Sequence, residues 1–194
     1  MELEAELIKR SKNGDVDAFE RLISPYQKKI LNFAYRMLAS REDAEDAAQE
    51  VFVKAYKALG SFDAESGFST WLYKIASNTC LDELRRRKRR GDDKSISINR
   101  ESEDGEYELP LHDETNSPYL SAQKKEAHKA LASAIEQLGE EHRAVVVMRD
   151  INGLSYEEIA RITDSAVGTV KSRLCRARLI LRKILEKDRE LFIE

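Results

Sequence analysis

The chain has 194 residues, which suits one large domain or two small ones. Hydrophobic residues make up 41% of it and charged residues 36%, a balance that favours small helical domains with a high surface-to-volume ratio. The 8 glycines and 3 prolines are too few for the many tight turns of an all-β protein, so we expect an all-α fold.

The net charge of -3 conceals a separation of charge along the chain. Cationic runs occupy residues 85–90 and 171–183, and an acidic stretch covers residues 101–114. Nucleic-acid binding depends on the local field rather than on the total charge. The low pI therefore does not exclude DNA as a partner.

Several classes of protein are disfavoured. Cys80 and Cys175 are far apart and form no Cys-x-x-Cys pair, so we expect neither a disulfide nor a metal site. The acidic N-terminus lacks the cationic start and apolar core of a signal peptide, and no apolar run approaches the ~18 residues of a membrane span. We expect a cytoplasmic protein.

Apolar residues recur at helical spacing through the first 91 residues. The spacing predicts a short helix near residues 2–11 and another near residues 24–37. A third follows Ser40, its predicted N-cap, and stops at Gly60. A fourth is predicted to start near Ser69 and to end at Gly91.

The helical pattern disappears over residues 92–121, where acidic side chains alternate with glycine and proline. Such a stretch is too long for a loop inside a compact domain. Helical spacing then returns. We therefore predict two small helical domains, residues 1–91 and 122–194, joined by an acidic flexible linker, residues 92–121.

Residues 153–183 carry the pattern of a helix-turn-helix. Ser155 and Glu158 form a Ser-x-x-Glu capping box at the start of a short helix. Asp164 is predicted to take the left-handed conformation in the turn, and Ser165 is predicted to cap the second helix.

The outer face of that second helix is polar and cationic, opposite a predicted buried seam. Arginine can bond two acceptors on guanine, and neighbouring cations can bind phosphates. The alternative is a solvated face on a helical hairpin, which the two caps, the short turn and the basic sector disfavour. The face and its flank comprise Thr169, Lys171, Ser172, Arg173, Arg176, Arg178, Arg182 and Lys183.

Two further faces are less specific. Asp46, Gln49, Glu50 and Val53 lie opposite the apolar stripe of the third helix, where a merely solvated face is the usual explanation. On the fourth helix an aromatic, an amide and two cations share one sector, which would suit unpaired bases. The residues alone equally allow a half-buried tryptophan with solvated cations. That sector contains Trp71, Lys74, Asn78 and Arg85.

The segment Gly-Leu-Ser-Tyr-Glu-Glu-Ile-Ala at residues 153–160, with Val-Gly-Thr-Val-Lys-Ser-Arg at 167–173, resembles region 4.2 of bacterial extracytoplasmic-function sigma factors, in the sigma-70 family. That region reads the promoter −35 element. Family members often have proline at the position of Ala166 and an aromatic at that of Cys175. The resemblance implies −35 contacts by Thr169, Lys171, Ser172, Arg173, Cys175, Arg176 and Arg178.

Residues 43–52 resemble region 2.2 of the same family, whose helix docks on the coiled coil of the polymerase β′ subunit. This implies core-polymerase binding by Asp46, Gln49, Glu50 and Val53. Residues 68–78 resemble regions 2.3 and 2.4, which melt the −10 element, and the loop before them corresponds to a flipped-base pocket. The implied −10 residues are Phe62, Asp63, Phe68, Ser69, Thr70, Trp71, Lys74, Asn78 and Arg85.

The resemblance thus implies a non-enzymatic sigma factor, without cofactor or metal, that directs bacterial RNA polymerase to promoters and promotes strand opening. Its partners would be core polymerase, through the β′ coiled coil and the β subunit, promoter DNA, and an anti-sigma factor, often membrane-anchored. When free it would be a monomer.

Two rival functions remain to be weighed. A stand-alone regulator would bind duplex DNA without polymerase and would have no use for the face around Glu50. A nucleic-acid enzyme would need a catalytic constellation. Instead His112 lies in the predicted linker, His128 and His142 lie on polar helix surfaces, and the sequence has no glycine-rich phosphate loop.

Overall fold

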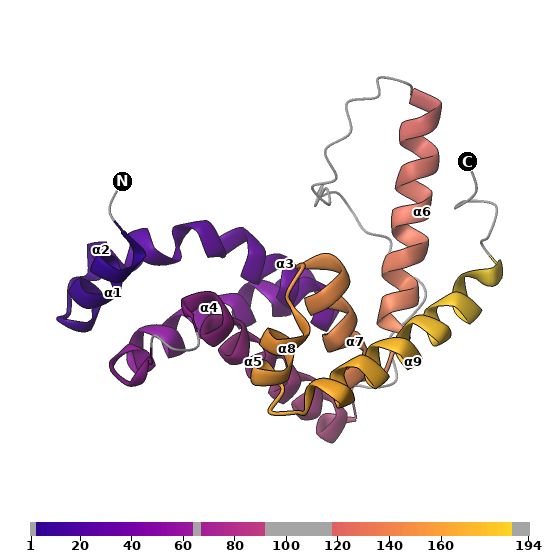
Figure 1. Cartoon of the computed structure of the whole chain (residues 1–194). Coiled ribbons are helices and arrows are strands. Elements are labelled where there is room, and N and C mark those ends of the chain that lie inside the picture. The colour runs from indigo at the N-terminus through magenta and orange to yellow at the C-terminus, as the bar shows by residue number, and fades with distance from the viewer. Residues whose placement is uncertain (1–2, 64–66, 92–117, 188–194) are drawn as a thin grey trace.

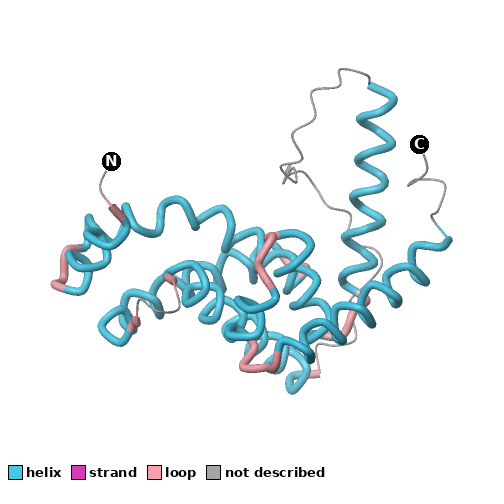
Figure 2. Tube along the Cα trace, in the orientation of Figure 1, coloured by secondary structure: helices cyan, strands magenta, loops and turns pink. Residues whose placement is uncertain are grey.

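The computed structural model describes residues 3–63, 67–91 and 118–187, and its regular elements in these ranges are all helical (Figures 1 and 2). This confirms the all-α prediction. In chain order they are α1 (Glu4–Lys12), α2 (Val16–Ile23), η1 (Ser24–Tyr26), α3 (Gln27–Leu38), α4 (Arg41–Ala58), η2 (Leu59–Ser61), α5 (Phe68–Arg90), α6 (Pro118–Glu136), α7 (Glu140–Val146), the π-helical turn η5 (Val147–Ile151), α8 (Tyr156–Ile162) and α9 (Val167–Leu185).

The N-terminal unit, α1 to α5, is built around α3, α4 and α5, which contact one another pairwise. Its core contains Ile30 and Phe33 from α3, Val51 from α4 and Leu72 from α5, none of them accessible to solvent. The small residues Ala44, Ala47, Ala48 and Ala55 line the buried stripe of α4. Side chains this small let the neighbouring helices approach α4 closely on its buried side.

The C-terminal unit comprises α6 to α9, in which α9 packs on α6, α7 and α8. Val170, Leu174, Ala177 and Leu181 are the buried seam of α9, at the spacing that the sequence predicts. The opposite side of α9 therefore faces away from the protein.

The predicted caps are largely present. The Ser40 hydroxyl accepts a hydrogen bond from the Asp43 amide at 3.4 Å. In the capping box, the Glu158 amide donates to the Ser155 hydroxyl at 3.2 Å, and the Ser155 amide donates to the Glu158 carboxylate at 2.7 Å. Asp164 has φ +47°, in the left-handed region predicted for the turn. The helix-turn-helix is therefore formed by local signals.

Three local predictions were wrong. Helix α5 begins at Phe68 rather than Ser69, after Gly67, whose φ of +70° suits glycine. The N-cap of α9 is Ala166, with no side-chain bond, because the Ser165 hydroxyl donates instead to the Thr163 carbonyl at 3.1 Å. Helix α6 begins at Pro118, inside the predicted linker; proline needs no amide partner in a first turn. The remainder of that linker, 92–117, lies outside the described residues.

The two units are packed against each other. Helix α8 contacts α5, and α3 contacts α6, α7 and η5. Figure 1 shows α7 and α8 beside α3 and α5, with α1 and α2 at one end of the molecule and α6 at the other. The buried apolar side chains of both units accordingly belong to one connected cluster.

Replacing Ser155 with alanine removes both side-chain bonds of the capping hydroxyl and should lower the free energy of unfolding by about 1 kcal/mol. Urea denaturation followed by circular dichroism measures the change. Ser172→Ala, an exposed serine within α9, is the matched control and should shift the free energy by no more than about 0.5 kcal/mol. Equal effects of the two substitutions would contradict the capping role.

Candidate nucleic-acid and polymerase interfaces

The outer face of α4 presents an apolar centre within a polar rim. Asp46, Gln49 and Glu50 are exposed, and Val53 is 52% exposed among them. The sequence did not single out Tyr56, which is 39% exposed and continues the apolar strip. Its ring meets Phe19 edge to face, 5.0 Å between centroids. Apolar side chains inside a polar rim are typical of protein-binding surfaces.

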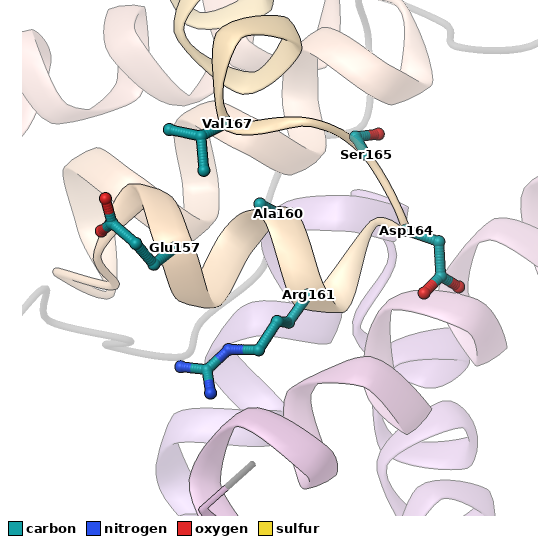
Figure 3. A pocket seen from close by; sticks show the side chains of 6 residues that line it. All are labelled: Glu157, Ala160, Arg161, Asp164, Ser165 and Val167. Atoms are coloured by element: carbon teal, nitrogen blue, oxygen red, sulfur yellow. The ribbon is translucent and has the colours of Figure 1, made fainter. Parts of the chain in front are cut away.

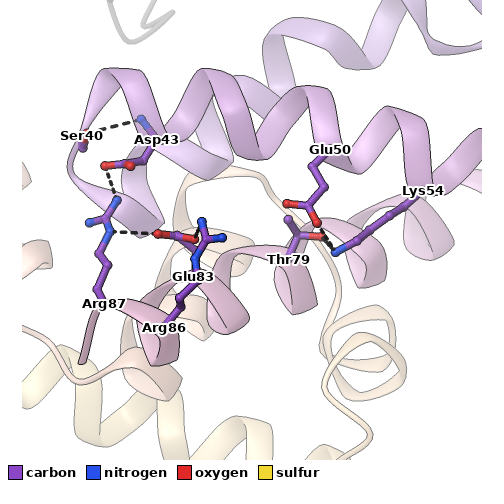
Figure 4. A network of polar contacts seen from close by, with 8 residues as sticks. All are labelled: Ser40, Asp43, Glu50, Lys54, Thr79, Glu83, Arg86 and Arg87. Carbon is purple, nitrogen blue, oxygen red and sulfur yellow. Dashed lines mark hydrogen bonds and ion pairs between the residues drawn. The ribbon is translucent and has the colours of Figure 1, made fainter. Parts of the chain in front are cut away.

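A polar network fixes α4 on α5 (Figure 4). Arg87 forms ion pairs with Asp43 at the start of α4 and with Glu83 on its own helix, and donates to the Leu38 carbonyl at 2.9 Å. Lys54 pairs with Glu50 at 2.9 Å and donates to the Thr79 hydroxyl at 3.1 Å. Glu50 is thus held in place while it stays accessible.

The nine residues implied for −10 binding range from buried to exposed. Phe62 and Phe68 are 4% and 1% exposed, and their rings lie 5.1 and 5.6 Å from that of Trp71. They support Trp71, which is half-buried. Thr70 is buried, Ser69 and Lys74 are half-buried, and the exposed members are Asp63, Asn78 and Arg85.

The −35 set lies together on the outer face of α9, and every member is exposed except the half-buried Arg173. Arg173 pairs with Glu141 of α7 at 2.9 Å. Arg178 pairs with Asp150 of η5, and this hydrogen bonding raises the pKa of the guanidinium. Arg176 forms no ion pair with any residue in the described ranges, so it is the arginine of the −35 set most available to a ligand.

A cation–aromatic stack that the sequence did not predict lies beside this face. The Tyr156 ring has the Arg149 guanidinium 4.7 Å from its centroid and the Lys171 ammonium 5.4 Å away. The three residues come from η5, α8 and α9, so no local spacing could have indicated the stack. It positions Lys171, a member of the −35 set.

The surface between α8 and the start of α9 is a shallow hollow (Figure 3). Figure 3 shows Arg161 and Asp164 pointing in different directions from its rim, with the Asp164 carboxylate turned toward the N-terminal unit. Ala160 and Val167 also line the hollow, together with Glu157 and Ser165.

The described residues offer little for metal binding or redox chemistry. No three His, Cys, Asp or Glu side chains of the described residues come close enough together to hold a metal ion. Cys80 is buried, which raises the pKa of its thiol to about 12, whereas Cys175 is exposed on α9. Among the helices of the described ranges, none has the length and apolar character of a membrane span.

Family models match most of the chain. The Sigma-70 region 2 model matches residues 22–90, and the Sigma-70, region 4 model matches residues 128–181. The first match covers α3, α4 and α5, and the second covers α7, α8 and most of α9. Each proposed binding face lies inside one of these matches.

Relatives match over nearly the whole length. The chain is 39% identical over 187 residues to the RNA polymerase sigma-H factor of Pseudomonas aeruginosa, covering 95% of each chain. It is 40% identical over 172 residues to the ECF RNA polymerase sigma-E factor of Escherichia coli K12, covering 89% of this chain and 88% of the relative. Among solved structures, CnrH bound to the cytosolic domain of CnrY superposes with a TM-score of 0.67 at 25% identity, covering 94% of this chain and 96% of CnrH.

Proposed function

We propose a division of labour among three helices of this chain, which belongs to the extracytoplasmic-function sigma factors of the sigma-70 family. As a sigma factor it directs RNA polymerase to promoters and is not an enzyme. Helix α4 anchors core polymerase, α5 holds the separated −10 strand, and α9 reads duplex DNA at the −35 element. The observation that carries this proposal is that the residues implied for the three partners lie around three different helices, largely exposed on α4 and α9 and ranging from buried to exposed around α5.

On α4, the docking surface consists of Asp46, Gln49, Glu50 and Val53, to which we add Tyr56. The apolar strip supplies the buried centre of an interface, and the surrounding carboxylates and amide give it orientation and specificity. The β′ coiled coil is the proposed partner. The Lys54–Glu50 ion pair holds the Glu50 carboxylate on the α5 side of this surface, where the side chain is 56% exposed (Figure 4).

On α5, Trp71 stacks with an unpaired base while Lys74, Asn78 and Arg85 bind base edges and phosphates. Stacking on an aromatic ring is worth about 1–3 kcal/mol per base, enough to offset part of the stacking lost when the strands separate. The buried Phe62 and Phe68 hold the tryptophan in position. Strand opening then needs no nucleotide hydrolysis.

On α9, Arg176 is the proposed base-reading arginine, and Arg173 and Arg178 are oriented by Glu141 and Asp150. Lys171, held on Tyr156, binds a phosphate. Tethering the −35 and −10 contacts to one polymerase raises their joint affinity through effective concentration. Each contact alone is weak.

We also propose that an anti-sigma factor holds this chain inactive in the cytoplasm. CnrH, the solved relative at 25% identity, is bound to the cytosolic domain of CnrY. A partner of that kind would have to cover surfaces that core polymerase needs.

Run-off transcription with purified bacterial core polymerase tests the proposal as a whole. Core supplemented with this chain should give discrete transcripts from a subset of a promoter library, and core alone should not. Transcripts from none of the templates would sink the proposed function.

Charge reversal by Glu50→Lys places a cation beside Lys54 and opposite the partner surface, so affinity for core polymerase should fall by a factor of about ten or more. Fluorescence anisotropy of the labelled protein with core measures the affinity. Glu186→Lys makes the same charge change at the end of α9 and should leave core binding unaltered. A Glu50→Lys protein that binds core normally would remove α4 from the docking surface.

Arg176→Ala removes the arginine of the −35 set that has no ion pair with the described residues. The change should lower −35-dependent transcription by about tenfold, because a bidentate arginine–guanine contact contributes about 1–3 kcal/mol. Core binding should not change. Lys28→Ala removes an exposed cation from α3 and should alter neither property. Transcription that is equally insensitive to both substitutions would be inconsistent with base reading by Arg176.

A further inference from the structure

An aromatic cluster surrounds Trp71, the side chain proposed to stack on an unpaired base. The centroid of the Phe62 ring lies 5.1 Å from that of Trp71 and 5.7 Å from that of Phe68. Tyr26 meets the Phe68 ring edge to face, with 5.5 Å between centroids. The position of Trp71 therefore depends on Phe62 and Phe68, and through Phe68 on Tyr26.

The last residue of α1 holds Phe62 in two ways. The Lys12 ammonium donates a hydrogen bond to the Phe62 carbonyl at 2.8 Å. The same ammonium lies 5.7 Å from the centroid of the Phe62 ring, within the range of a cation–π contact. One side chain thus fixes both the backbone and the ring of Phe62, although the two residues are 50 positions apart.

The first residue of α1 anchors the helix to the same cluster. The Tyr26 hydroxyl donates to the Glu4 carboxylate at 3.0 Å. Burial, and then the nearby Glu4 carboxylate, raise the pKa of Tyr26 to about 12, so the phenol keeps its proton and remains a donor at physiological pH. The helix that presents Lys12 is therefore held against the aromatic cluster at its other end.

The bond from Lys12 also acts on the chain that follows Phe62. The Phe62 amide donates to the Leu59 carbonyl at 3.1 Å, which closes the η2 turn. The peptide group that carries the Phe62 carbonyl also carries the Asp63 amide and is planar, so fixing one orients the other. Asp63 belongs to the −10 set. Lys12 accordingly sets the direction in which the chain enters this part of the site.

From these contacts we propose that Lys12 is a positioning residue of the −10 site and acts through Phe62. The inference rests on the proposed function of α5. Lys12 holds the Phe62 ring against Trp71 and holds the peptide of Asp63, so the stacking platform is in place before a strand arrives. A platform held in this way loses less conformational freedom when a base stacks on it. The match to the Sigma-70 region 2 model begins at residue 22, so α1 lies outside it.

The effect on Trp71 can be observed directly, because the chain has 1 tryptophan. Time-resolved fluorescence anisotropy of the free chain should show a larger amplitude of fast local motion of the Trp71 ring in Lys12→Met than in wild type. Lys9→Met makes the same charge change at an exposed residue of α1 and should leave the decay unchanged. A decay that is identical in Lys12→Met and wild type would overturn the positioning of Trp71.

Holoenzyme reconstituted from core polymerase and this chain tests the consequence for DNA binding. The probe is a fluorescent single-stranded oligonucleotide with the non-template −10 sequence of a promoter that gave transcript in the run-off assay. Lys12→Met should weaken its binding about fivefold, because a hydrogen bond and a cation–π contact are lost together. Lys12→Arg, which can donate to the same carbonyl and lie over the same ring, should restore most of the affinity. Lys9→Met should bind as wild type does.

The salt dependence of binding separates positioning from a direct contact between Lys12 and a DNA phosphate. Each phosphate contact with a single strand contributes about −0.7 to the slope of log affinity against log salt concentration. Loss of a positioning residue should leave that slope unchanged. A slope shallower by about 0.7 in Lys12→Met would mean that Lys12 binds phosphate itself, and would overturn the inference.

Failure of the inference can be told apart from failure of the proposed function, because wild-type transcription is measured separately. If wild type gives transcripts and Lys12→Met holoenzyme binds the oligonucleotide as tightly as wild type does, the inference is overturned and the proposed function stands. An absence of wild-type transcripts from every template would overturn both.

Discussion

The structure depends on one constraint: α5 packs against helices of both units at once. It packs against α3, α4, α7 and α8, so little of its circumference is left for solvent. Leu72 and Ala76 fill the core of the N-terminal unit, and Tyr73 reaches the boundary with the C-terminal unit. Every change in the position of α8 therefore changes what α5 can present to a ligand.

Internal ion pairs place several of the chain's arginines beside carboxylates. Arg87 is shared between Asp43 and Glu83, Arg173 faces Glu141, and Arg178 faces Asp150. Such pairs are weak when exposed, so they orient the cations without removing them from use. Arginines held in this way lose less conformational freedom when they bind DNA than free side chains would.

The order of the motifs along the chain also follows a physical logic. The face of α4 proposed to bind polymerase and the face of α5 proposed to bind the −10 strand belong to one unit, in which Arg87 and Lys54 join the two helices. The face of α9 proposed to read duplex DNA belongs to the other unit. Two weak DNA contacts in one chain, one from each unit, would raise each other's effective concentration when both are made.

Much of the fold could be predicted from the sequence because its signals are local. The apolar spacing of α4 and α9, the Ser40 cap, the Ser155–Glu158 box and the left-handed Asp164 depend on residues only a few positions apart. The faces of α4 and α9 follow from the same spacing. The Ser165 cap was wrong because its hydroxyl donates to the Thr163 carbonyl instead. Helix α5 begins one residue before Ser69 because Gly67 takes the positive φ that precedes it.

What the sequence by itself determined is thus most of the helices, α2 (Val16–Ile23) not among them, and the outward faces of α4 and α9. Only the tertiary structure decided that Phe62 and Phe68 are buried beneath Trp71, that Tyr56 extends the α4 surface, and that Asp164 meets Lys74. Residues 90 positions apart carry no mutual periodicity. Their contact depends on how the two units pack against each other, and local sequence patterns do not encode this long-range packing.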